Sequence, residues 1–527
     1  MGIFKLFKSL LAFLIFFSGF SQSNADDFKF VEATIDDIHQ ALSSGDMTCR
    51  EIVSGYLNRI KSYDQQSGLN AITVVNQKAL DKADQIDRKI SNGEKLGPLY
   101  CVPMLIKDNY DTHDLPTTGG SIALMNNYPP DDAFMVRKLR ESDAIVIAKT
   151  NMAEWAFSPR QTKSSSFGTT ANAYDLSRVP AGSSGGTASG TAASFGVAGM
   201  GTDTGNSIRG PSSHLALFGI RSTIGLTSRD GIIPLAWDRD VAGPMTRTVK
   251  DGALIFNVVA GYDPNDPMTE LGKGKRKADY TAFLKKDGLK GKRIGVLRAL
   301  VTTEDADPEI IALFLKAVDD LKAAGAIIVD PFEITNLDQH REAPNFCRRF
   351  RYDMHEYLKS LGDKAPIKDV MEVLETGEYS PYVKGGLENF GAGPLDIHPG
   401  NENPPCPEYP NHPGRNAFKA DVIKSMDKYN VDVVIYPSWT NPPAKLDLAD
   451  EDYKGDNSQI IAPATGLPAA TVPMGYSHGN LPAGLQILAR PFREDVIFGV
   501  AYAYEQATKH RKPPSLFPEL KNNDKKM

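Results

Sequence analysis

The chain contains 527 residues, of which 41% are hydrophobic and 24% charged, and its formal net charge is −6. This balance is typical of a folded globular protein and excludes extensive intrinsic disorder. Lysine and arginine form no block except a short turn at residues 273–277, so the charge pattern predicts no nucleic-acid partner. The length fits either several domains or one large α/β domain with an insertion.

The first 25 residues have the layout of a secretory signal peptide. Lys5 and Lys8 precede an apolar run at residues 10–20, and a stretch of small residues ends at Ala25. The run is shorter than the ~20 residues of a membrane-spanning helix, so an anchor is the weaker alternative. We expect cleavage after Ala25 and a mature protein of residues 26–527. It would be periplasmic or secreted, or in an endomembrane lumen if the source is eukaryotic, with no stable membrane anchor.

The mature chain is predicted to begin with helices. Thr34 and Asp37 open a short helix, and Thr48 with Glu51 forms the capping box of a second. Strands and helices then alternate, which predicts an α/β layered fold. In chain order these elements are strand 100–106, helix 134–140, strand 144–148, strand 293–297, helix 308–324, strand 326–329 and strand 431–436.

Residues 336–416 lack strand signals and end in a loop rich in proline and glycine, at residues 391–414. We expect a helical insertion with a long loop. Long loops in compact domains are usually functional or disordered, so the segment is either a lid over a site or a passive excursion on the surface.

Four cysteines, all beyond the predicted signal peptide, are available for disulfides: Cys49, Cys101, Cys347 and Cys406. Four cysteines allow three full pairings, and we expect at most one disulfide. The scattered spacing contains no C-x-x-C metal or redox motif, so the cysteines suggest neither zinc nor thiol chemistry.

Glycine, serine, threonine and alanine dominate residues 178–223, where A-G-S-S-G-G occupies 181–186 and G-T-D-T-G-N-S-I-R-G-P occupies 201–211. A serine hydroxyl attacks an amide only with the help of a base and of N–H groups aimed at the developing oxyanion. The glycine-rich turn that ends in Ser207 can supply such N–H groups.

No histidine is an obvious partner for this serine, so a lysine is the alternative base. Burial would have to lower the pKa of that lysine from about 10.4, leaving the amine neutral and able to accept a proton. Lys107 ends the apolar run at residues 101–106 and fits this role. Without the serine motif, an exposed strand end would be the better interpretation.

These motifs resemble the amidase signature family, whose catalytic unit is a Ser-cisSer-Lys triad. The family's G-G-S-S-G-G is similar to residues 181–186, its G-T-D-x-G-G-S-I-R-x-P to residues 201–211, and its G-x-P-x-x-x-K-D-N to residues 101–109. The resemblance extends over roughly residues 34–508. It implies a single large α/β domain, with a twisted mixed β-sheet covered by helices on both faces, and needs no cofactor or metal.

The resemblance also implies roles. Lys107 would be the base, Ser207 the nucleophile, and Ser183 the proton relay, because the family's bridging serine precedes its nucleophile by 24 residues, which excludes Ser184 from that role. The implied reaction converts a small carboxamide into a carboxylate and ammonia or an amine through an acyl-enzyme. The resemblance further implies an oxyanion hole made by the backbone N–H groups of Thr204, Gly205, Asn206 and Ser207. It also implies supporting roles for Ser184, Asp203 and Arg209.

Several positions depart from the family pattern. Cys101, Ala181 and Asn206 stand where glycine is usual, and I-R-S-T at residues 220–223 stands where L-K-P-T is typical. If position 206 needs a positive φ, asparagine is the least costly replacement. Two alternative functions stay open. A glutamyl-tRNA amidotransferase A-like subunit is disfavoured because it would need cytosolic ATP and tRNA, and a catalytically silent binding protein because the triad is complete. Neither the amide substrate nor the oligomeric state can be inferred from the sequence.

Overall fold

The computed structural model describes residues 28–343 and 346–521, so the predicted signal peptide lies outside the described residues. Among the described helices, none has the length and apolar character needed to cross a membrane. The helices are α1 (Ile35–Ser44), α2 (Cys49–Ser67), α3 (Ala79–Ser91), α4 (Phe134–Glu141), α5 (Gly185–Ala192), α6 (Arg209–His214), α7 (Val249–Val259), α8 (Pro308–Ala323), α9 (Leu337–Glu342), α10 (Phe350–Ser360), α11 (Glu372–Thr376), α12 (Lys384–Phe390), α13 (Pro413–Lys428), α14 (Ala462–Thr465) and α15 (Glu494–Thr508).

The strands of the described chain form one eleven-stranded sheet, in the order β1-β3-β2-β6-β8-β7-β12-β13-β11-β9-β10, and a separate small hairpin of β4 and β5. Parallel pairs such as β2 with β6 adjoin antiparallel pairs such as β6 with β8, so the sheet is mixed. The strands are β1 (Ile72–Val75), β2 (Pro103–Lys107), β3 (Ile145–Thr150), β4 (Thr162–Ser164), β5 (Gly168–Thr170), β6 (Ala198–Asp203), β7 (Phe218–Arg221), β8 (Val241–Thr246), β9 (Arg293–Val296), β10 (Ile327–Val329), β11 (Val433–Pro437), β12 (Ala469–Ser477) and β13 (Leu481–Ala489).

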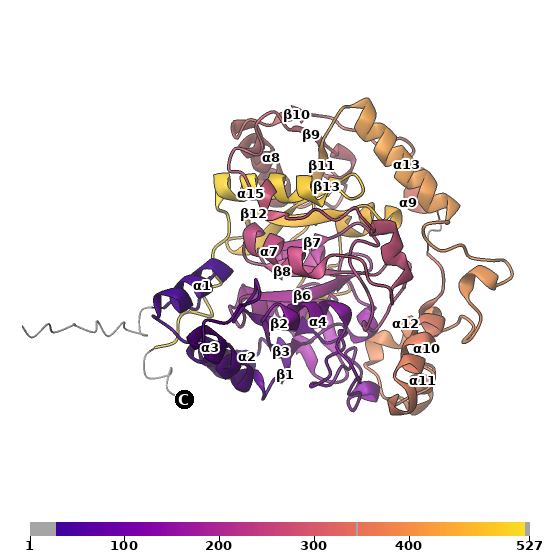
Figure 1. The fold of residues 1–527 in the computed structure, drawn as a ribbon. Helices are drawn as coiled ribbons and strands as arrows, with labels where there is room; N and C mark the ends of the chain where they lie inside the picture. The colour runs from indigo at the N-terminus through magenta and orange to yellow at the C-terminus, as the bar shows by residue number, and fades with distance from the viewer. Residues whose placement is uncertain (1–27, 344–345, 522–527) are drawn as a thin grey trace, which may run out of the picture.

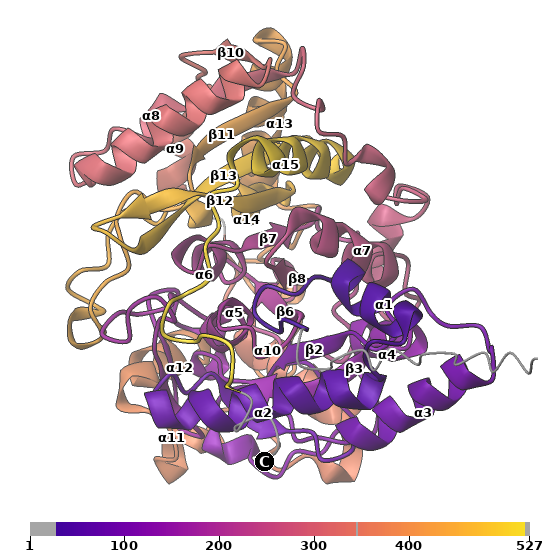
Figure 2. The same cartoon turned by 90° about the vertical axis from the view of Figure 1, so that its left-hand side faces the viewer.

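Helices cover both faces of this sheet, as β13 illustrates. Leu485 and Ile487 pack into a core cluster with Phe314 of α8 and Phe498 of α15, whereas Leu488 joins another cluster with residues of α13. Successive side chains of a strand point to opposite faces, so each face of β13 meets a different helical layer. Figure 1 shows α8 and α15 on one side of these strands and α13 on the other, and Figure 2 shows α5 and α6 at the middle of the sheet. The predicted α/β fold is confirmed.

The predicted start of α1 at Thr34 and the predicted capping box of α2 are confirmed. Thr34 and Thr48 accept from the backbone N–H groups of Asp37 and Glu51, so α1 has a capping box as well. The strand predicted at 100–106 instead begins at Pro103. Residues 100–102 form a turn in which Cys101 has a φ of 60°, a conformation that a regular strand does not contain.

The segment at 336–416 contains α9, α10, α11 and α12, and no strand among its described residues. It packs on the body of the protein through a cluster that joins Phe350 and Met354 of α10 with Trp155 and Ile233. Figure 1 shows α10, α11 and α12 grouped beside the lower strands of the sheet. The role of this segment as a lid stays a prediction.

Two disulfides, Cys49–Cys101 and Cys347–Cys406, are present, so the expectation of at most one was wrong. Cys49 is the first residue of α2, and Cys101 lies in the turn before β2, 52 positions further along the chain. Spacing along the sequence carries no information about which turns the fold brings together, which is why the pairing could not be predicted.

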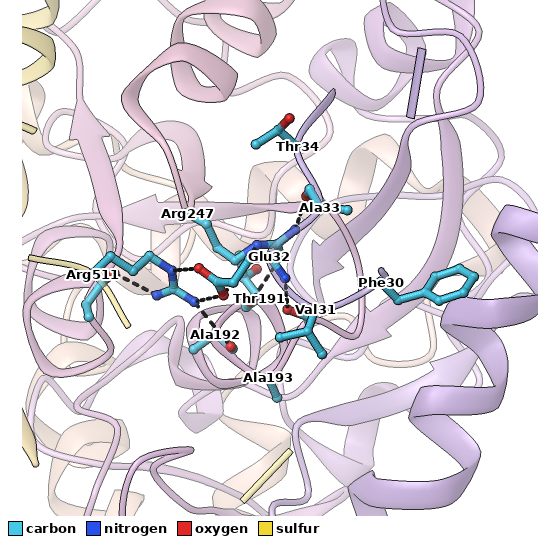
Figure 3. A network of polar contacts seen from close by, with 12 residues as sticks. Phe30, Val31, Glu32, Ala33, Thr34, Thr191, Ala192, Ala193, Arg247 and Arg511 are labelled. Atoms are coloured by element: carbon cyan, nitrogen blue, oxygen red, sulfur yellow. Dashed lines mark hydrogen bonds and ion pairs between the residues drawn. The ribbon is translucent and has the colours of Figure 1, made fainter. Parts of the chain in front are cut away.

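Three arginines from distant parts of the chain bind the carboxyl end of α5, and Figure 3 shows two of them, Arg247 and Arg511. Arg59, Arg247 and Arg511 donate to the backbone oxygens of Ala193, Thr191 and Ala192 at 2.9, 3.1 and 3.3 Å. Glu32 binds Arg511 through both carboxylate oxygens, each at 2.7 Å. Because α5 has the weakly helix-forming sequence G-G-T-A-S-G-T-A, cations at its carboxyl end are an important part of its stability.

Arg511→Met should lower the free energy of unfolding by about 2–4 kcal/mol, since it removes charge-assisted hydrogen bonds to Glu32 and to backbone oxygens. Urea denaturation measures this loss. Arg50→Met is the matched control, because Arg50 meets Asp84 at the surface and its loss should cost about 0–1 kcal/mol. Equal losses in the two variants would contradict this account of α5.

Candidate active site

Lys107 ends β2, the third strand in the order of the sheet, with β3 on one side and β6 on the other. It shares a face of the strand with Leu105, which lies against α5. The parallel register pairs Ile106 with Met200, which brings Lys107 level with the end of β6. Its Nζ lies 2.7 Å from Ser183 Oγ and 2.6 Å from Thr202 Oγ1.

The Lys107 side chain is completely buried. Burial lowers the pKa of its amine to about 7, although the carboxylates of Asp240 and Asp203 oppose the change. A substantial fraction of this amine is therefore neutral near pH 7 and can accept a proton.

Ser183 and Ser184 immediately precede α5, and the peptide bond between Gly182 and Ser183 is cis. Of the two serines, Ser183 contacts the lysine amine, whereas Ser184 Oγ donates to the backbone oxygen of Thr202 at 3.2 Å. Gly182 must be glycine here, because a Cβ atom would lie 2.4 Å from backbone oxygens of the neighbouring loop. Tight backbone packing thus holds the two serines at the end of β6.

Ser207 lies in the turn between β6 and α6 and is 5% exposed. Its hydroxyl lies 3.5 Å from Asn206 Oδ1, and no hydrogen bond links it to Ser183, although both residues are described. The backbone N–H groups of residues 204–207 donate to no acceptor within the described part of the chain. This turn therefore presents a serine hydroxyl together with a set of free N–H donors.

A buried charge cluster fixes the turn that carries Ser207. Asp203 accepts from Arg209 and from Arg221, each at 3.1 Å, and from the backbone N–H of Ile208 at 3.1 Å. Burial alone would raise the pKa of Asp203, but the two guanidinium groups outweigh it and lower the pKa to about 2. Asp203 stays ionised, so the turn keeps its shape across the physiological pH range.

Asp240 also stabilises the turn at residues 204–207, through a hydrogen bond from Thr204. Its carboxylate accepts from Thr204 Oγ1 at 2.5 Å and from the backbone N–H groups of Leu235 and Ala236 at 2.9 and 3.1 Å. Burial raises the pKa of Asp240, while these donors oppose that change.

A cavity of about 230 Å³ opens beside Ser207. Its walls combine the turn that carries Ser207 with aromatic side chains, of which Phe346 and Phe390 come from the predicted insertion and Phe157 from the body of the protein. Arg239 and Gln459 are the other polar side chains on the wall away from the turn.

The three departures from the glycine pattern have different physical consequences. Ala181 and Cys101 have φ values of 64° and 60°, so both occupy conformations that favour glycine, and Cys101 is held there by its disulfide. Asn206 does not have a positive φ, so its replacement of glycine is not a backbone requirement.

Several residues of the site were missed from the sequence. Thr202 lies within the G-T-D motif next to Asp203, and that position was the available signal. Arg221 stood out only as part of the departure from the family pattern at residues 220–223, with no role assigned. Nothing in the local sequence marks the three phenylalanines, because they reach the site only through the tertiary fold.

The described residues also contain one group able to hold a metal ion, formed by His113, Asp114 and Asp132. Arg140 already pairs with Asp114 at 2.5 Å and with Asp132 at 3.1 Å. One guanidinium thus already binds both carboxylates of this group, and none of its three residues lines the cavity beside Ser207.

Comparison with known proteins identifies the class to which this fold and site belong. The family model described as Amidase matches residues 51–498, and the chain therefore belongs to the amidase signature family of amide hydrolases. The A subunit of the glutamyl-tRNA(Gln) amidotransferase of Gloeothece citriformis (strain PCC 7424) is 34% identical over 511 residues, covering 92% of this chain and 99% of the relative.

Two solved structures show the same architecture. The peptide amidase of Stenotrophomonas maltophilia has a TM-score of 0.81 at 31% identity, covering 92% of this chain and 99% of its own. The A subunit of the glutamyl-tRNA(Gln) amidotransferase of Thermotoga maritima has a TM-score of 0.70 at 26% identity, covering 94% and 99%.

Proposed function

We propose that this protein is an exported amidase that hydrolyses a carboxamide C–N bond through an acyl-enzyme on Ser207. The observation that carries the proposal is the buried Lys107 amine, with a pKa of about 7, at 2.7 Å from the Ser183 hydroxyl. A neutral amine in contact with a serine is the arrangement needed for a lysine to act as general base.

In this mechanism Lys107 accepts the proton of Ser183, and Ser183 accepts the proton of Ser207 as its Oγ attacks the carbonyl carbon. The proton returns through Ser183 to the leaving nitrogen, and the C–N bond breaks. Water then attacks the acyl-enzyme by the reverse path, which releases the carboxylate and regenerates Ser207.

The backbone N–H groups of residues 204–207 form the proposed oxyanion hole. Their lack of acceptors within the described part of the chain supports this role, because donors already engaged elsewhere could not stabilise the tetrahedral intermediate. Ser184, Asp203 and Arg209 act by holding the two serine turns in place.

The substrate proposed for the cavity carries an apolar or aromatic group. Phe157, Phe346 and Phe390 line one side of it, and a wall of this kind favours an apolar portion of a ligand while a few polar groups orient the reacting bond.

A second candidate is an amidotransferase A-like subunit, because curated relatives carry that name. The layout of residues 1–25 and the two disulfides favour the exported amidase instead, since disulfides persist outside the reducing cytosol. Amino-terminal sequencing of protein exported by the native leader should begin at Asp26. An intact leader on cytosolic protein would contradict export.

Purified mature protein should release ammonia from carboxamides without ATP, tRNA or any partner protein. The experiment compares acetamide, butyramide, benzamide and phenylacetamide, and the apolar wall predicts higher kcat/KM for the two aryl compounds. Turnover that requires ATP and glutamyl-tRNA would support the amidotransferase candidate and overturn this proposal.

A further inference from the structure

Asn206, the residue that replaces the family's glycine before Ser207, uses both ends of its side-chain amide. Nδ2 donates to Asp456 Oδ2 at 2.9 Å and to the backbone oxygen of Pro159 at 3.4 Å. At the other end, Oδ1 lies 3.5 Å from Ser207 Oγ. Asn206 is 1% exposed, so solvent offers its amide no alternative partners.

Asp456 is itself held firmly by its neighbours. Its Oδ2 also accepts from Tyr453 Oη at 3.0 Å and from Gln459 Nε2 at 3.1 Å, and its Oδ1 accepts from the backbone N–H of Ser458 at 3.2 Å. Gln459 Nε2 additionally donates to Tyr453 Oη at 2.6 Å. These contacts fix the position of the Asp456 carboxylate. They therefore also fix the acceptor that Asn206 Nδ2 binds.

In its ionised form the Asp456 carboxyl only accepts hydrogen bonds, and its Oδ2 already accepts from three donors, whereas an amide has a donating end and an accepting end. Asp456 therefore favours the orientation in which Asn206 Nδ2 faces the carboxylate. The accepting Oδ1 is then directed at the Ser207 hydroxyl. The reversed amide would place two acceptors against each other at Asp456 and a donor against the nucleophile.

We propose that Asp456 is a positioning residue, which acts through Asn206 to hold the Ser207 hydroxyl in the orientation needed for attack. This inference rests on the proposed function, because it assigns a role to a contact of the proposed nucleophile. A glycine at position 206 has no side chain to orient. Asp456 therefore matters for turnover only while asparagine occupies position 206.

The test is a double-mutant cycle that uses kcat and KM for phenylacetamide or the best carboxamide of the series. Asp456→Ala should lower kcat about tenfold, with KM changed less than about threefold, because orientation rather than substrate binding is lost. In the Asn206→Gly background the same Asp456→Ala change should alter kcat less than about twofold. Asp450→Ala is the matched control, since Asp450 pairs with the exposed Arg160 and does not contact Asn206.

Equal losses of kcat in both backgrounds, or no loss in either, would overturn the proposal. Thermal unfolding reports whether each variant is folded. If Asp456→Ala does not fold, Asp456→Asn preserves the side-chain shape, and its loss of kcat should likewise vanish in the Asn206→Gly background. Ser207→Ala is assayed in parallel: turnover in that variant refutes the proposed function itself, whereas additive losses with inactive Ser207→Ala refute only the role of Asp456.

Discussion

Ser207→Ala should lower kcat/KM for carboxamides by at least about a thousandfold, because the acyl-enzyme cannot form without the attacking oxygen. The fold should survive, since the change removes one hydroxyl whose contact is a long one of 3.5 Å to Asn206. Ammonia release measures the loss, and thermal unfolding verifies that the variant is folded.

Ser213→Ala is the matched control for this experiment. Ser213 lies in α6, is equally buried, and its hydroxyl has no hydrogen-bond partner in the described part of the chain. Its turnover should stay within about twofold of wild type, as expected for a residue outside the reaction. Near-normal turnover in Ser207→Ala would refute the assignment of the nucleophile.

Lys107→Met should lower kcat/KM by about 10²–10⁴, the usual contribution of a general base, while the methionine keeps most of the buried volume. The wild-type pH profile should identify the group. Below its pKa of about 7 the amine is protonated and cannot accept a proton, and above it the amine is neutral. Wild-type kcat/KM should therefore rise with pH and level off above about 7, and this limb should disappear in Lys107→Met.

Asp456 provides the control for that profile, because burial raises the pKa of its carboxyl to about 7 as well. If the rise of kcat/KM with pH comes from deprotonation of Lys107, the Asp456→Asn variant should show the same rise near pH 7, although its kcat is lower. If kcat/KM still rises with pH in Lys107→Met, or no longer rises in Asp456→Asn, a group other than Lys107 controls the pH dependence.

Local sequence patterns predicted much of the fold. The helix start at Thr34, the capping box at Thr48, the strand–helix–strand run at residues 293–329 and the strand before Lys107 are all predicted by propensity and periodicity, which act over a few residues. The edges of elements were less predictable. The turn at Cys101 shortened β2, because a disulfide to α2 holds that residue in the left-handed region.

Long-range contacts were beyond the reach of such patterns. The separation of 24 residues selected Ser183, which contacts Lys107, yet the neighbouring Thr202 at 2.6 Å was overlooked. Asp456 lies 250 positions from Asn206, and only the folding of both segments against one another creates their contact. The same holds for Arg511 and Glu32, which close a network between the two ends of the chain.

The central claim is that Ser207 becomes acylated in a site where Lys107 removes protons through Ser183. The most direct measurement is to treat the active enzyme with a fluorophosphonate and to locate the modified residue by mass spectrometry of its peptides. The account predicts modification of Ser207, together with loss of turnover in proportion to labelling. Modification of a different residue, or full turnover in enzyme labelled at Ser207, would contradict it.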